Sequence, residues 1–270
     1  MKIYISADIE GAACICAPAE ADMGQQPEYA PFRDQMTAEV AAACAGAYAA
    51  GADHVVVKDA HWTGRNIDPH KLAAPEGKAL QLIRGWSGHP FSMVQGLDAS
   101  FAGAAFVGYH SAAGSGGNPL AHTFSGMFAR IELNGAVASE FVIYAYAAAT
   151  VGVPVVFLSG DKVLCGEAQA LVDGIVTVST LEGFGPSVVS ILPREALRLI
   201  ESGMRRAASA RAARALPMPR DFAFKLSFNK ARDAYERSFY PGAKQVSDTE
   251  LLLETKNYLE VLTFLQYMAK

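Results

Sequence analysis

The chain begins with Met1-Lys-Ile-Tyr-Ile-Ser-Ala-Asp8-Ile-Glu10-Gly11, a stretch that indicates both the type of fold and the place of a site. The short apolar run at residues 3–7, bounded by Gly11, predicts a buried strand. Side chains two positions apart on a strand point to the same side, so Asp8 and Glu10 come together at its carboxyl end. Two carboxylates held that close repel each other unless a positive group lies between them. A metal ion is the simplest candidate for that group.

Two further segments place metal-binding residue types directly after a predicted strand. His54-Val-Val-Val-Lys58 runs into Asp59-Ala60-His61, and the apolar residues 102–108 run into Tyr109-His110. The carboxyl ends of parallel strands lie along one edge of a sheet and share one crevice. Taken singly, an acid at a strand end often caps the next turn, and one histidine is more often an ordinary surface or core residue. Three such coincidences favour a shared metal site at this edge.

The rest of the chain alternates between predicted helices and strands. Loops are expected at residues 18–31 and 111–121, and a hairpin at 129–137. Helices are expected at 32–50, 139–149, 193–215 and 257–268, and a further helix is expected to begin at 161. Strands are expected at 80–83, 153–158, 175–178 and 222–228. This alternation predicts an α/β fold with a mainly parallel sheet flanked by helices, followed by a smaller α+β C-terminal portion. We expect a metal-binding catalytic domain at residues 1–215 and the smaller portion at 216–270, unless the two form one continuous domain.

Composition excludes several classes of function. A net charge of −4 and a pI near 5.9 argue against nucleic acid or an anionic membrane as the main partner. No apolar stretch approaches the roughly 20 residues that span a bilayer, and the first residues lack a signal-peptide pattern. The cysteines show no disulfide or zinc spacing, so a reducing, cytoplasmic setting is expected. Phosphate-binding and dinucleotide-binding glycine motifs and the His-Glu-x-x-His zinc motif are also absent.

Two more residues become candidates through their position. His122 follows His110 after a loop rich in glycine and small residues, which could carry the ring back over the metal site. Glu140 follows Ser139 at the expected start of a helix. From the residues alone, a surface histidine and a simple dipole-stabilising acid are the more common interpretations of these two positions.

These motifs together resemble the zinc-dependent D-aminopeptidases of the bacterial dipeptide-transport-operon type. The resemblance runs from Met1 to nearly the end of the chain and is weak after Leu216. It rests on Asp8-Ile-Glu10-Gly11, Asp59-Ala60-His61, Gly108-Tyr109-His110, His122, Ser139-Glu140, Phe91-Ser-Met-Val-Gln-Gly-Leu97 and Pro154-Val-Val-Phe-Leu-Ser-Gly160-Asp161.

The resemblance implies a ligand set, a catalytic residue and an assembly. The metal ligands would be Asp8, Glu10, His61, His110 and Glu140, with two zinc ions per subunit, and the proposed nucleophile would be His122. The substrates would be short peptides or amides that contain D-amino acids. The family also implies a large homo-oligomeric ring, a decamer being one candidate, with its sites facing an internal chamber. The many alanine, glycine and aliphatic residues agree with extensive burial between subunits.

Two departures from the family pattern bear on substrate choice. The loop from His110 to His122 is about one residue longer than the resemblance leads us to expect. At residues 179–187 we expect basic residues, yet the chain has Thr-Leu-Glu-Gly-Phe-Gly-Pro there. Basic residues that help to hold a substrate carboxylate or a neighbouring subunit would therefore be missing.

The chemistry of the ligand set leaves more than one function open. Mixed carboxylate and imidazole ligands suit zinc, and two metals can polarise a carbonyl and activate a water. We favour that activated water as the attacking group with His122 as acid, whereas the family assigns the attack to His122. The alternatives are another binuclear metallohydrolase, either an amidase or a phosphoesterase, and a non-catalytic ring-forming protein with a structural metal. A phosphoesterase would need basic residues in the crevice, and only Lys58 and Arg65 are near.

Overall fold

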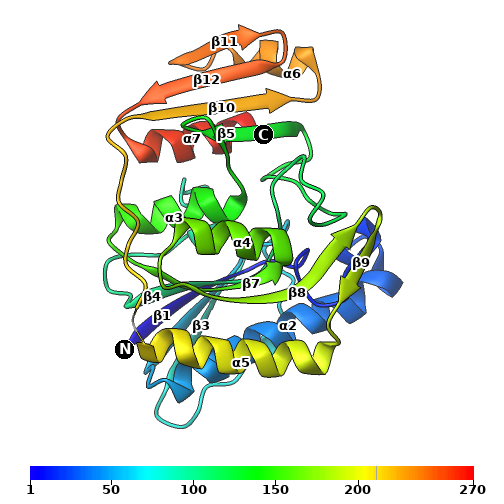
Figure 1. Cartoon of the computed structure of the whole chain (residues 1–270), viewed down its shortest axis with the longest axis vertical. Helices are drawn as coiled ribbons and strands as arrows, with labels where there is room; N and C mark the ends of the chain where they lie inside the picture. Colours follow the sequence, from blue (N-terminus) through cyan, green and yellow to red (C-terminus); the bar gives the residue numbers. More distant parts are fainter. Residues whose placement is uncertain (211) are drawn as a thin grey trace.

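The computed structural model describes residues 1–210 and 212–270, and its main feature is a seven-stranded sheet (Figure 1). The strand order is β3-β2-β1-β4-β7-β8-β9, and only the edge strand β9 runs antiparallel to its neighbour. The strands are β1 (Lys2–Ala7), β2 (His54–Asp59), β3 (Ala79–Ile83), β4 (Gly103–Tyr109), β7 (Val155–Asp161), β8 (Val176–Phe184) and β9 (Ser187–Ser190). Because β1 lies between β2 and β4, with Ala7 paired to both Asp59 and Val107, the ends of these strands meet at one edge.

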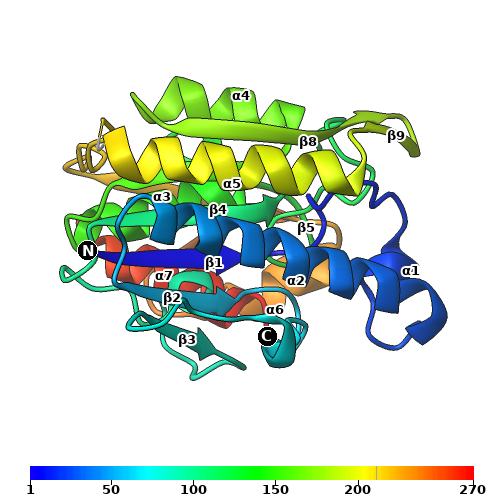
Figure 2. The same cartoon turned by 90° about the horizontal axis from the view of Figure 1, so that it is seen from below.

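Helices cover both faces of this sheet. On one face, α2 (Gln26–Ala49) and α5 (Pro193–Ala210) lie side by side (Figure 2). On the other face lie α3 (Glu140–Thr150) and α4 (Lys162–Leu171) (Figure 1). The sequence fixes where α3 and α4 begin, because the side chains of Ser139 and Asp161 accept hydrogen bonds from backbone N–H groups of the first turns.

A second, five-stranded antiparallel sheet lies beyond α3 and α4 in the order β11-β12-β10-β5-β6 (Figure 1). Its strands are β5 (Phe128–Leu133), β6 (Ala136–Val137), β10 (Phe222–Phe228), β11 (Ala243–Ser247) and β12 (Glu250–Thr255). Helix α7 (Tyr258–Met268) packs between this sheet and α3, and the Tyr258 hydroxyl donates to the Ile143 carbonyl at 2.7 Å. Alternate residues of β10 are buried, as expected for a strand with one covered face.

The α/β prediction is confirmed, including the strands that lead to Asp8, His61 and His110. The second sheet takes β5 and β6 from residues 128–137 and its other strands from beyond residue 216. The division of the chain at residue 215 stays a prediction. Among the described residues, no helix combines the length and apolar character needed to cross a bilayer.

Two predicted boundaries were wrong. The expected loop at 18–31 contains helix α1 (Pro18–Ala21) and the first turns of α2. Pro27 falls in the first turn of α2, where its missing N–H is not needed, and Pro31 lies inside the helix. The helix expected to reach residue 215 ends at Ala210, and Arg211 lies outside the described residues. Proline restricts only the residue before it and the carbonyl four residues earlier, so Pro217 by itself does not account for an end at Ala210.

Other elements were not predicted. Strand β8 extends six residues beyond the expected strand at 175–178, as far as Phe184. Strands β9, β11 and β12 and the short helix α6 (Ala231–Arg237) are among these unpredicted elements. Strands β9 and β11 are largely exposed, so they lack the continuous apolar pattern by which buried strands are recognised. Strand β12 does contain the apolar run Leu251–Leu253, but only three residues long.

Candidate metal centre

The candidate site lies at the carboxyl edge of the parallel sheet, where the predicted residues come together. Five side chains meet there, each at most 5% exposed. They are Asp8 and Glu10 after β1, His61 after β2, His110 after β4 and Glu140 at the start of α3. All of these except His110, together with His122, line a cavity of about 960 Å³.

Two glycines let the end of β1 pack directly against the end of β4. A Cβ on Gly11 would lie 1.8 Å from the Tyr109 carbonyl oxygen, and one on Gly108 would lie 2.4 Å from the Asp8 carbonyl oxygen. Gly108 also has a φ of +72°, which other residues rarely adopt. The Gly11 N–H donates to the Gly108 carbonyl at 2.8 Å. This approach, which the sequence analysis missed, brings Asp8 beside His110.

His61 is held so that one ring nitrogen faces two carboxylates. Its Nε2 donates to the Ala21 carbonyl oxygen at 2.8 Å. Because a carbonyl oxygen can only accept, Nε2 carries the hydrogen. The other nitrogen, Nδ1, lies 3.1 Å from Asp8 Oδ1 and 3.1 Å from Glu10 Oε2. A proton or a metal ion must therefore sit on the Nδ1 side of the ring to relieve the two negative charges.

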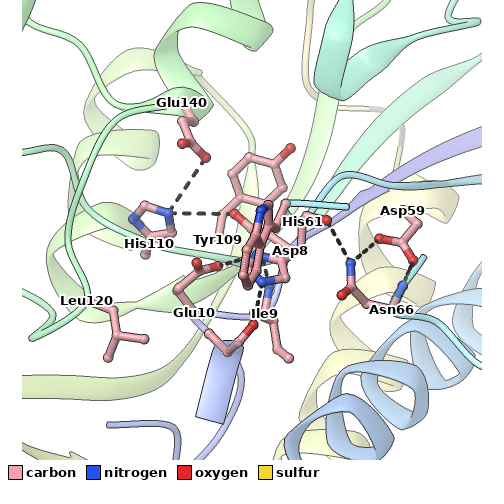
Figure 3. Close-up of polar contacts among 12 residues, drawn as sticks. Asp8, Ile9, Glu10, Asp59, His61, Asn66, Tyr109, His110, Leu120 and Glu140 are labelled. Carbon is pink, nitrogen blue, oxygen red and sulfur yellow. Dashed lines mark hydrogen bonds and ion pairs between the residues drawn. The ribbon is translucent and has the colours of Figure 1, made fainter. Parts of the chain in front are cut away.

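His110 repeats this arrangement with a different pair of acids. Its Nδ1 donates to the Ser111 carbonyl oxygen at 3.0 Å. Its Nε2 lies 3.6 Å from Asp8 Oδ2 and 3.6 Å from Glu140 Oε2 (Figure 3). The other oxygen of Glu140, Oε1, accepts the backbone N–H of Phe124 at 2.6 Å. Glu140 therefore turns one oxygen toward His110 while the other holds the loop that carries His122.

His122 lies over the cluster at the edge of the cavity. Its ring stacks on that of His110, with 4.4 Å between the ring centroids and 22° between the planes. Its Nδ1 donates to the Leu120 carbonyl oxygen at 2.9 Å, and its Nε2 lies 3.9 Å from Glu140 Oε1. With 31% of its side chain exposed, it is more accessible than the five buried residues. The glycine-rich loop thus does return His122 to the site.

In this cluster, neighbouring histidines reduce the repulsion between closely spaced acidic side chains. Burial, with a contribution from Glu10, raises the pKa of Asp8 well above its usual range. Burial also opposes the charged form of Glu10, yet the neighbouring histidines, His61 foremost, hold the pKa of Glu10 well below its usual range. Burial likewise lowers the pKa of His61 and of His122, but the nearby carboxylates raise both above the ordinary value. The cluster therefore holds protons that a bound cation would displace.

A buried network behind His61 fixes the position of its loop. Asp59 accepts hydrogen bonds from the backbone N–H groups of Asn66 (2.5 Å) and Ile67 (2.7 Å). The Asn66 side-chain amide donates to Asp59 (2.8 Å) and to the His61 carbonyl (2.7 Å) (Figure 3). The oxygen of the same amide accepts from the Tyr29 hydroxyl at 2.8 Å. Asp59 therefore supports the loop instead of joining the cluster. The sequence analysis did not identify Asn66, which carries no motif that would reveal this role.

Three buried polar atoms of the cluster make no hydrogen bond in the described structure: Glu10 Oε2, His110 Nε2 and Glu140 Oε2. Buried polar atoms are nearly always satisfied, so these atoms require another partner. The ligand-type atoms form groups whose members all lie within 4.8 Å of one another: Asp8 with Glu10 and His61, Asp8 with His110 and Glu140, and Glu10 with His110 and His122. This mixed oxygen and nitrogen donor set fits a divalent transition metal.

Comparison with known proteins agrees with this geometry. The sequence profile of the D-aminopeptidase family matches residues 1–267. A D-aminopeptidase from Bacillus subtilis (strain 168) is 34% identical over 201 residues, which cover 74% of this chain and 71% of that protein. The solved structure of the Zn-dependent D-aminopeptidase DppA from Bacillus subtilis, described as a self-compartmentalizing protease, matches with a TM-score of 0.92 at 28% identity, covering 99% of this chain and 96% of that one. The chain therefore belongs to the D-aminopeptidase family.

Proposed function

We propose that this protein is a zinc-dependent aminopeptidase that releases N-terminal D-amino acids from short peptides or amides. The observation that carries the proposal is that Asp8 belongs to two of the candidate metal groups. Its Oδ1 lies near His61, its Oδ2 lies near His110, and the two groups are completed by Glu10 and by Glu140 respectively. One carboxylate placed between two donor groups supports a pair of ions in which Asp8 is the shared ligand.

The hydrogen bonds of the histidines support the same ligand set. His61 and His110 each donate one ring N–H to a backbone carbonyl and turn the other nitrogen toward the carboxylates. Histidines that bind metals in proteins are almost always oriented by such a bond. We therefore propose that Asp8, Glu10, His61, His110 and Glu140 hold two zinc ions, in agreement with the solved relative, which is named as zinc-dependent.

When bound, a pair of divalent ions polarises the scissile carbonyl and lowers the pKa of a water molecule toward neutrality. Glu10 and Glu140 border the cavity, so the ions that they would hold lie within reach of a substrate there. His122 moves a proton, and its free nitrogen Nε2 is the atom that does so, because Leu120 occupies Nδ1–H. In our proposal a protonated Nε2 donates to the leaving amine. The nucleophilic role implied by the family would require the same nitrogen to be unprotonated.

The basic residues near the site do not favour a phosphoesterase. The Lys58 ammonium donates to the Asp59 carbonyl at 2.6 Å and to the Gly85 carbonyl at 2.7 Å, so it is directed into the loops instead of the cavity. Arg65 does not line the cavity. Apart from histidines, Lys270 is the basic residue among the described cavity-lining positions. Transfer of a phosphoryl group needs positive charge around its oxygens, which this lining does not concentrate.

Metal content and substrate stereochemistry together test the proposal. Elemental analysis of protein purified without chelator should give close to two zinc ions per chain. Hydrolysis of D-aminoacyl peptides and amides should exceed that of the L-forms and should be lost after prolonged chelation and restored by zinc. Activity that survives complete removal of the metal would refute the proposal, as would hydrolysis of L-peptides alone.

We also propose that the protein forms a closed homo-oligomeric ring, with a decamer as the specific candidate. The solved relative is described as self-compartmentalizing. In this chain the β8–β9 hairpin and the segment just after it expose large apolar side chains: Phe184 is 78%, Val189 70% and Leu192 72% exposed. Phe184 lies within residues 179–187, where the family resemblance led us to expect basic residues, and Val189 and Leu192 follow shortly after. We therefore propose apolar contacts between subunits there. Light scattering should give a mass near ten chains, and a monomer mass would refute the ring.

We propose the cytoplasm as the compartment. All four cysteines are free, and Cys44 and Cys165 are buried. Free cysteines agree with a reducing environment, where disulfides rarely persist. Fractionation of the producing cells should recover the protein with cytoplasmic markers, and recovery outside the cell would contradict this assignment.

A further inference from the structure

Two tryptophans form an exposed aromatic wall in the cavity that contains the metal centre. Trp62 directly follows His61 and is 59% exposed, and Trp86 is 40% exposed. Both line the cavity together with Glu10 and Glu140. Exposed large aromatic groups beside a reactive centre are unusual enough to require an explanation, because burying them is strongly favourable.

The wall is held in a fixed geometry by buried groups. The Trp86 indole N–H donates to the Trp62 carbonyl oxygen at 2.7 Å. The Lys58 ammonium lies 3.9 Å from the centre of the Trp86 ring, a cation–π contact that holds the ring in place. Lys58 is itself fully buried and bound to two backbone carbonyls. Trp86 is therefore anchored from behind while its other surface remains open to the cavity.

The backbone that carries the wall is equally constrained. Trp62 has a φ of +36°, a conformation that non-glycine residues rarely adopt. The Gly85 N–H donates to the Gly64 carbonyl at 2.7 Å, and a Cβ on Gly64 would lie 2.9 Å from the Gly85 backbone. The two loops are thus joined, and the strained Trp62 conformation is maintained by its neighbours. Strain of this kind collects at functional sites, where the surrounding structure enforces it.

We infer that Trp62 and Trp86 form a subsite for a bulky apolar side chain of the substrate, so that the enzyme prefers aromatic or large aliphatic D-residues beside the scissile bond. This inference rests on the proposed function. Met93, Leu120 and Phe124 line the same cavity and extend its apolar surface. Because Trp62 adjoins His61 in the chain, a substrate whose scissile bond lies at the metal centre is within reach of the wall. Rigid aromatic groups of this kind lose little conformational entropy on contact.

The test compares matched D-Phe and D-Ala substrates in Trp62→Ala and Trp86→Ala. Two pairs of substrates are used: the members of one pair differ only at the first residue, and the members of the other pair differ only at the second residue. The kcat/KM is measured for both members of each pair. At one of these positions, the wild-type preference for D-Phe should fall roughly 5- to 50-fold in Trp62→Ala, since apolar pockets discriminate side chains by about this amount. Trp62→Phe should retain most of the preference. Phe239→Ala, which removes a 72% exposed aromatic group outside the cavity lining, should not change it.

Metal content and assembly mass measured on each variant separate the subsite from other roles. A D-Phe to D-Ala ratio that stays at the wild-type value in both tryptophan variants at both positions would overturn the inference. An altered assembly mass with an unaltered ratio would do so too, because it would assign the wall to a subunit contact. If the wild-type protein hydrolyses no D-aminoacyl substrate at all, the failure belongs to the proposed function and not to the subsite.

Discussion

The acidic residues of the two sheets have different charged partners. In the antiparallel sheet, Lys225 of β10 lies 2.6 Å from Glu132 of β5 and 3.5 Å from Glu250 of β12. Lys244 of β11 pairs in the same way with Glu254 of β12 at 2.5 Å. Each of these acids therefore has a lysine on the neighbouring strand, at a surface that water can reach.

At the edge of the parallel sheet the acids have no such partners. Within residues 1–210 and 212–270, Asp8, Glu10 and Glu140 form ion pairs with histidines only. In the antiparallel sheet, side chains of opposite charge lie across from each other on neighbouring strands. In the parallel sheet, the side chains at the carboxyl ends of the strands come together in a single crevice. This difference supports our proposal that a cation bound from solution compensates the negative charge at the parallel edge.

Removing a ligand should have the largest effect and would test the comparison most directly. His61→Ala and His110→Ala each remove a nitrogen that faces two carboxylates, so metal occupancy and activity should fall together. Loss of a ligand exceeds the roughly 10- to 100-fold cost of losing a residue that merely orients one. Elemental analysis and kcat/KM on the same preparations measure both effects. Full metal content in either variant would show that the residue is not a ligand.

His122→Ala should come next, with a different signature. His122 is the most exposed member of the cluster and serves the reaction in our proposal. Both metal ions and the homo-oligomeric assembly should therefore remain in this variant. The rate should fall roughly 10²- to 10⁴-fold, the usual effect of losing a positioned acid–base group. A larger loss with the metal intact would favour covalent attack by His122. Nearly unchanged turnover would make His122 a bystander.

Asn66→Ala tests whether the network behind His61 matters to the centre. The substitution removes the donors to Asp59 and to the His61 carbonyl and leaves Asp59 partly unsatisfied in a buried site. We expect metal affinity or activity to fall roughly 10- to 100-fold, as for other residues that orient a ligand. Titration with zinc in a competing chelator measures the affinity. An unaltered affinity and rate would separate this network from the site.

Glu39 of α2 is a buried acid whose hydrogen-bond partners are not histidines. We expect it to remain protonated, in contrast to acids that bind a metal ion. It accepts from the Ala13 N–H and from the Gln35 side chain, each at 2.8 Å, yet burial raises its pKa to about 7. Between about pH 4.5 and 7 the folded state keeps a proton that the unfolded state has lost. The stabilisation is therefore complete below pH 4.5 and is lost as the pH rises through 7.

The variant Glu39→Gln removes this titration and should flatten that part of the stability curve. The expected difference is of the order of 3 kcal/mol across the window, since one pKa unit corresponds to about 1.4 kcal/mol. Denaturant unfolding of both proteins from pH 4 to 8 measures it. Parallel curves for the two proteins would show that Glu39 does not titrate in this range.

The smallest effect belongs to the antiparallel sheet. Lys225→Met removes the partner of Glu132 and Glu250, but the Lys225 side chain is 35% exposed and its pair is screened by water. Such pairs contribute about 0.2–1 kcal/mol, so the free energy of unfolding should change by no more than that. Metal content and kcat/KM should match the wild type. A loss of metal in this variant would abolish the contrast between the sheets.

The parts that could be predicted are those that local pattern controls. The strands ending before Asp8, His61 and His110 are short, continuous and apolar, and the parallel arrangement follows from their alternation with helices. His122 and Glu140 were weak candidates from the residues alone and gained weight only through the family resemblance. The extra turns before Phe32 show that element boundaries near proline depend on which turn the proline occupies, whereas α5 ends at Ala210, several residues before Pro217.

The sequence by itself determined that acids and histidines follow buried strands, and it thereby predicted a metal-type site at one sheet edge. Only the tertiary structure decided which residues share that site. The contacts of Gly11 and Gly108 set the spacing of β1 and β4, the turn at residues 61–67 directs Asp59 away from the cluster, and the joined loops bring Trp62 and Trp86 together. Periodicity records which side of one element is buried, whereas a site depends on distances between elements, which packing alone fixes.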